Sequence, residues 1–167
     1  MRTVFPVRST ELGHVERAGS GAVVVLDKSE RRLLGDLIDS MLELLDNGGR
    51  DDPAVERLFP DAYGSEAEAR AWHDLVGDEL QRNKVSSLRS VKGALKHRRI
   101  ELDEAEMQMW LSALNDVRLA IGARLEVTEE MMGAELARDD PRAPTLAVMH
   151  WLGWLQESML RAMPSGR

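Results

Sequence analysis

The sequence contains no cysteine, and this absence excludes disulfides, thiolate metal sites and thiol nucleophiles. Long apolar runs are also missing. The one apolar run within residues 1–26 covers only residues 22–26, which is too short for the apolar core of a signal peptide. It is also far from the about 18 residues of a membrane-spanning helix. We therefore expect a cytoplasmic protein that has no membrane partner.

Motifs of catalytic and metal sites are missing as well. The histidines show neither the H-x-x-x-H nor the H-E-x-x-H spacing of a zinc site. The short glycine cluster at residues 19–21 precedes a predicted strand, whereas a phosphate-binding loop precedes a helix. No nucleophile, general base and oxyanion donor form a recognisable pattern. The sequence thus predicts no metal, no cofactor and no catalytic residue, and a hydrolase or metal enzyme is the least favoured function.

Basic residues, in contrast, are concentrated in one segment of an acidic chain. The 22 Lys and Arg against 29 Asp and Glu give a formal charge of −7. Seven of the basic residues, and no acidic one, lie between residues 82 and 99; without them 15 basic residues face 29 acidic ones, a charge of −14. This basic block consists of Arg82, Lys84, Arg89, Lys92, Lys96, Arg98 and Arg99. Such an uneven charge distribution points to an anionic partner.

The basic block coincides with a predicted helix over about residues 84–97. Four of its cations fall in one stripe at helical spacing: Arg82, Arg89, Lys92 and Lys96. An apolar stripe beside them predicts that the helix lies on the core and displays these cations. They would contact nucleic acid or an acidic protein surface. An ordinary solvated face, or a counterweight to the protein's own acidic helices, is the alternative, and no base-reading motif is present.

The remaining pattern predicts a mainly α fold. Short β-branched segments at residues 3–7 and 22–26 predict a small ribbon of two or three strands within residues 1–26. Capping boxes at Asp27, Ser65 and Asp103 predict helices that end near Gly48, Gln81 and Leu125, and Asn83 is expected to break the chain before the basic helix. Residues 100–102 are expected as an extended link, and a last helix spans about 145–162.

We therefore expect one domain over residues 1–167, because the length and the 43% of apolar residues suit a single core. The N-terminal β ribbon would occupy residues 1–26. An irregular bundle of about five helices would occupy residues 27–163.

Polar residues within the helix that starts at Asp103 form a second candidate site. Asn115, Asp116 and Arg118 lie on this helix, and Arg118 is positioned to pair with a carboxylate such as Glu157 on the last helix. One interpretation is a polar network that fixes the register of the two helices. The other is a surface on which a partner docks.

Trp151 is a candidate interface aromatic. It points away from the apolar stripe of the last helix, and exposed aromatic residues are enriched at binding hot spots. The alternative is a Trp that packs at the edge of the core and has its indole N–H satisfied.

Two segments carry a family resemblance. Residues 110–125 and 151–160 resemble the two motifs of an actinobacterial family, formerly of unknown function, that is named after the actinomycete oxidative stress regulator AosR. Its members are commonly encoded beside the Clp adaptor ClpS. The resemblance implies a non-enzymatic transcriptional regulator, linked to oxidative stress, that docks through helix surfaces. An accessory factor of Clp-type proteolysis is the alternative.

The resemblance also bears on partners and on signal. It implies a protein partner from the transcription machinery or the Clp system, and it leaves direct DNA contact and a homodimer open. Because this chain lacks cysteine, it cannot sense oxidants by a thiol switch.

Overall fold

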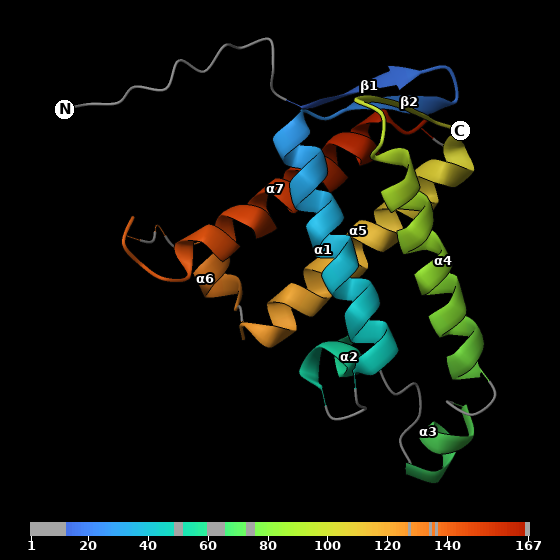
Figure 1. Cartoon of the computed structure of the whole chain (residues 1–167), viewed down its shortest axis with the longest axis vertical. Coiled ribbons are helices and arrows are strands. Elements are labelled where there is room, and N and C mark those ends of the chain that lie inside the picture. The colour runs from blue at the N-terminus through green and yellow to red at the C-terminus, as the bar shows by residue number, and fades with distance from the viewer. Residues whose placement is uncertain are drawn as a thin grey trace.

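The computed structural model describes residues 13–48, 52–59, 66–72, 76–126, 128–133, 135 and 137–165 (Figure 1). It confirms a mainly helical fold with a small antiparallel sheet. The elements in chain order are β1 His14–Ala18, β2 Gly21–Val25, α1 Lys28–Asn47, α2 Pro53–Leu58, α3 Glu66–Trp72, α4 Asp78–Ala94, β3 Arg99–Leu102, α5 Glu104–Arg124, α6 Glu129–Gly133 and α7 Ala143–Ala162.

The sheet has the order β1-β2-β3, with both pairs antiparallel. Its central strand β2 is buried along its whole length, as its continuous apolar run requires. A Cβ on Gly21 would lie 1.9 Å from the carbonyl oxygen of Leu102, so only glycine allows β2 and β3 to pair here. The segment 100–102, expected to be a link, is therefore part of strand β3. The strand expected at residues 3–7 lies outside the described residues, and β1 was not predicted.

The capping boxes at Asp27 and Asp103 are confirmed. Each aspartate accepts a hydrogen bond from the backbone N–H three residues on, and the glutamate at that position accepts one from the N-cap backbone. The helices that they begin each bury an apolar face, which includes Leu34 and Ile38 of α1 and Trp110 and Val117 of α5. Ser65, the third expected cap, lies outside the described residues.

The start of α4 differs from the prediction. This helix begins at Asp78, and Asn83 lies inside it and faces solvent. Asparagine in a helix costs only about 0.7 kcal/mol relative to alanine. Burial of Leu88 and Val91, both fully inaccessible, outweighs that cost. Of the helix expected over residues 65–81, α3 covers 66–72 and α4 already includes 78–81.

Helix α5 is the centre of the bundle (Figure 1). It contacts α4, α7 and α2, while α1 packs on both α4 and α5. The sheet covers one end of these helices, and α7 packs on β1 and β2. Among the side chains that the structure describes, Trp110 of α5, 1% exposed, is the largest that is fully buried. Within the described ranges, no helix is long and apolar enough to cross a membrane.

Candidate functional site

The basic block lies on α4, on the turn that follows it and on Arg99, the first residue of β3. Leu88 and Val91 anchor α4 in the core, which places Arg82 and Arg89 on the opposite, exposed side. These two arginines are seven residues apart, so they project from the same side of the helix two turns apart. Lys96, Arg98 and Arg99 continue the exposed cations beyond the end of the helix.

Lys84 is a correction to the predicted surface. Its side chain is only 15% exposed, and its Nζ lies 2.9 and 3.0 Å from the two carboxylate oxygens of Asp116 on α5. The same Nζ lies 5.9 Å from the centroid of the Phe59 ring. Lys84 therefore neutralises a buried carboxylate of its own chain and is not available to a partner. The reason is helical geometry, because Lys84 faces α5 whereas Arg82 and Arg89 face solvent.

Two further cations of the basic block form exposed ion pairs. Lys92 pairs with Asp39 of α1, and Arg99 pairs with Glu101 at 3.7 Å. Exposed pairs contribute at most about 1 kcal/mol, so a partner can displace them. The other four cations form no ion pair with any residue in the described part of the chain: Arg82, Arg89, Lys96 and Arg98.

Helix α1 extends the cationic surface, which the sequence pattern did not show. Arg31 lies beside the end of α4, where its Nη1 donates to the carbonyl oxygens of Leu95 and Lys96 at 3.3 Å. Arg31, Arg89 and Lys96 line an open groove of about 450 Å³ between α1 and α4. Only the contact between the two helices brings Arg31 to the basic block, so no sequence motif could have identified it.

A second hollow lies between α1 and the earlier part of α4. There Glu43 and Asp46 of α1 line it together with Arg89. The cationic character is therefore strongest near the last turn of α4.

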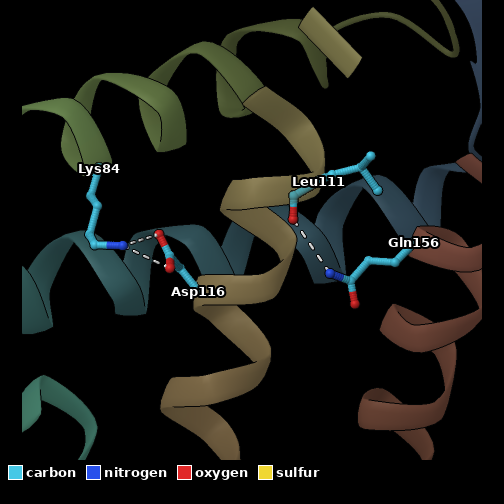
Figure 2. A network of polar contacts seen from close by, with 4 residues as sticks. All are labelled: Lys84, Leu111, Asp116 and Gln156. Carbon is cyan, nitrogen blue, oxygen red and sulfur yellow. Dashed lines mark hydrogen bonds and ion pairs between the residues drawn. The ribbon is translucent and has the colours of Figure 1, made fainter. Parts of the chain in front are cut away.

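The polar residues predicted as one network lie on two sides of α5. Positions 116 and 118 are about 200° apart around a helix. Asp116 points to α4, and Arg118 points to α7. In Figure 2, Lys84 reaches Asp116 from one side of α5 and Gln156 reaches the carbonyl of Leu111 from the other.

Arg118 has a different partner from the one expected. Its Nη1 donates to Oε1 of Gln156 at 2.8 Å, whereas Glu157 pairs with Arg161 one turn along α7. Glu157 lies about 100° farther round α7 than Gln156 and faces solvent, so the neighbouring amide takes its place. The Nε of Arg118 is buried and has no hydrogen-bond partner within the described residues. Asn115 is exposed and forms no hydrogen bond there.

Trp151 is held at the edge of the core. It is half-buried, and its Nε1 donates to Oε1 of Glu30 at 3.3 Å. The other carboxylate oxygen of Glu30 accepts from the backbone N–H of Asp27, so Trp151 joins α7 to the capping box of α1. The exposed aromatic residue of α7 is instead Trp154, with 40% of its surface accessible. The sequence pattern did not single it out.

The described residues contain no group of three His, Asp or Glu side chains that could hold a metal ion. The candidate surfaces described above are a cationic one on α4 and α1 and a mixed one where α5 meets α7.

Comparison with known proteins finds one matching family and curated relatives that carry the same name. The model of a family described as a domain of unknown function, DUF2017, matches residues 12–163. A curated protein of Mycobacterium tuberculosis (strain H37Rv) named "Oxidative stress regulator AosR" is 30% identical over 133 residues, or 70% of this chain and 60% of that protein. A protein of the same name from Mycobacterium bovis shows the same identity and coverage. The chain thus spans about 60% of the length of these relatives. No solved structure matches the chain.

Proposed function

The chain belongs to the DUF2017 family, and from this membership we propose that it is a non-enzymatic regulator that docks a helix surface onto an acidic protein of the transcription machinery. Its curated relatives are named oxidative stress regulators, which supports a regulatory role. Docking is the mechanism that fits a chain whose polar residues lie on helix surfaces.

The observation that carries the proposal is the set of free cations on and after α4. Arg82, Arg89 and Lys96 are exposed and unpaired within the described residues. They face outward from a chain with a formal charge of −7. An acidic partner surface would be attracted to these cations and steered to this face of the molecule.

The charge of the whole molecule favours a protein over duplex DNA as the partner. DNA presents a dense, extended array of phosphates, and it repels an acidic body at low salt. An acidic protein patch is smaller and can be matched by a local cationic surface.

The sequence has no cysteine. The part of the chain in an oxidative stress response therefore does not involve a thiol of its own. We infer that the oxidant signal reaches it through its partner or through its abundance.

The test compares two triple variants in affinity purification from native cells with mass spectrometry. The first is Arg82→Ala, Arg89→Ala and Lys96→Ala. The control, Arg17→Ala, Arg57→Ala and Arg138→Ala, removes the same charge from exposed positions outside α4 that form no ion pair within the described ranges. We expect RNA polymerase subunits or a sigma factor to be recovered about tenfold less with the first variant only.

Three other outcomes would change the proposed docking surface or the proposed partner. Equal recovery by both variants would remove α4 as the docking surface. Recovery of ClpS or a Clp ATPase would replace the proposal by an accessory role in proteolysis. Duplex DNA titrated at low and moderate salt gives the third readout: a steep salt slope that becomes shallower in the α4 variant would show direct DNA binding instead.

A further inference from the structure

The open groove between α1 and the last turns of α4, here called the α1–α4 groove, has an apolar floor. Its lining includes one glycine from each helix, Gly35 of α1 and Gly93 of α4. A Cβ on Gly93 would meet no atom within 4 Å, so the groove is open above this part of α4. Leu95 also lines the groove and is only 8% exposed, so it supplies the floor. A Cβ on Gly35 would lie 4.0 Å from Cδ1 of Leu95, which places this glycine beside the floor.

The rest of the lining is cationic, and no acidic residue is among the described residues that line this groove. Arg89, Lys92 and Lys96 come from α4 and the turn after it, and Arg31 comes from α1. Spacings of three and four positions place the first three on the same side of α4 as Gly93. Gly93 lies between Arg89 and Lys96 along this side. The apolar floor therefore has positive charge on both sides of it along α4.

These charges are available to a partner. Arg89 and Lys96 form no ion pair within the described ranges, and the pair of Lys92 with Asp39 is exposed, so another carboxylate can replace it. Arg31 donates to the carbonyl oxygens of Leu95 and Lys96, and its charge offsets the negative end of the α4 dipole. An anionic group that approaches the end of α4 is therefore attracted.

The two kinds of lining favour an occupant that is both acidic and apolar. A carboxylate gains from the cations, but by itself it leaves the floor in contact with water. An apolar side chain gains by covering Gly93 and Leu95, and the methylene stems of the Lys and Arg side chains extend the surface that it can cover. A segment that presents both groups close together uses the whole lining.

We propose that the α1–α4 groove binds a segment of the acidic partner in which one apolar side chain stands between Asp or Glu residues. The apolar side chain covers Gly93 and Leu95, and the carboxylates pair with Arg89 and Lys96 on either side of it. This inference rests on the proposed function, because it uses the same cations of α4. It adds an apolar contact that distinguishes one acidic surface from another.

Gly93→Leu is the decisive variant, because it fills the groove without changing any charge. The open space around position 93 accepts the new side chain, and leucine favours a helix more than glycine does. Gly133→Leu is the matched control. A Cβ on Gly133 also meets no atom within 4 Å, and this residue belongs to α6, which lies away from α4 (Figure 1).

The probes are three fluorescent peptides: one Leu between two pairs of Glu, the same peptide with Ser for Leu, and the same peptide with Gln for Glu. We expect the native chain to bind the first peptide about tenfold more tightly than either of the others in an anisotropy titration. Gly93→Leu should lose the preference for Leu over Ser and keep the preference for Glu over Gln. Gly133→Leu should behave as the native chain, and melting curves confirm that all three proteins are folded.

Four results would overturn the inference: no binding of any peptide, equal binding of the Leu and Ser peptides by the native chain, an undiminished preference for Leu in Gly93→Leu, or self-association that disappears in Gly93→Leu. The last would assign the groove to a second copy of this chain. The proposed function fails separately, when the triple alanine variant of α4 recovers its partner unchanged. If that variant loses its partner while Leu and Ser peptides bind the native chain equally, docking by charge stands and the apolar contact does not.

Discussion

Among single residues, the ion pair between Lys84 and Asp116 couples α4 to α5 inside the protein. The side chains of Lys84 and Asp116 are 15% and 8% exposed, so each charge is stabilised mainly by the other charge and little by water. Removing one partner leaves the other charge buried and alone.

We expect Asp116→Asn to lower the free energy of unfolding by about 3 kcal/mol, because the Lys84 ammonium then lacks a counter-charge. The double variant Lys84→Met with Asp116→Leu should recover most of that loss, since it removes both desolvated charges. Urea denaturation of the three proteins measures the effect. A double variant as unstable as the single one would mean that packing at these positions, and not the charge, holds the helices together.

Asp140, in the loop before α7, gives a prediction on pH. Its carboxylate accepts hydrogen bonds from the side chain and the backbone N–H of Arg142, which lower its pKa from 3.8 to about 2. A lowered pKa means that the ionised form stabilises the folded state. This contribution is complete above pH 3.8 and disappears as the pH falls through about 2.

Carboxyl carbon shifts of Asp140, followed by NMR through an acid titration, should therefore show a midpoint near pH 2 in the native chain. In Arg142→Ala the midpoint should rise toward 3.8. A native midpoint already near 3.8 would show that the two residues do not pair in solution.

Among the elements, those with local signals could be predicted and those that depend on distant contacts could not. The capping boxes and the apolar spacing of α1 and α5 depend only on residues that are close together in the sequence. Strand β3 is different, because four residues with alternating burial become a strand only when β2 lies beside them. Asn83 was misinterpreted for the same reason, since the packing of Leu88 and Val91 overrides its local preference.

The same division applies to the candidate sites. The basic block is visible in the sequence because its members are close together in the chain. That Lys84 turns inward, that Arg31 joins from α1 and that Gln156 takes the place of Glu157 all depend on how helices meet. Residue type and spacing alone do not contain this information.

Two glycines of different elements give a matched prediction. Gly21→Ala would drive a Cβ against the backbone carbonyl of Leu102, which cannot move without breaking the β2–β3 pair. We expect a loss of about 3 kcal/mol or more in the free energy of unfolding. Gly93→Ala in α4 has open space around its new methyl group and should stabilise the protein by about 0.5–1 kcal/mol. Thermal and urea denaturation of both variants test the pair, and a harmless Gly21→Ala would contradict the close approach of the strands.

On the scale of the whole molecule, the arrangement of the helices determines where the exposed cations lie. The free cations lie on and after α4, and Arg118 lies where α5 meets α7, while α5 stands between the two outer helices (Figure 1). The contacts of α5 with α4 and with α7 therefore lie on different sides of α5.

The sheet has a consequence for how quickly the chain folds. Helices alone form within microseconds. Strand β2, however, pairs with β3 across the whole of α1 to α4, joining positions as distant in the sequence as Val25 and Arg99. That long loop must close before the strand partners can stabilise each other, and such closure is slow. We therefore expect this mostly helical chain to refold as slowly as a β protein, because the pairing of the four-residue strand β3 with β2 limits the rate.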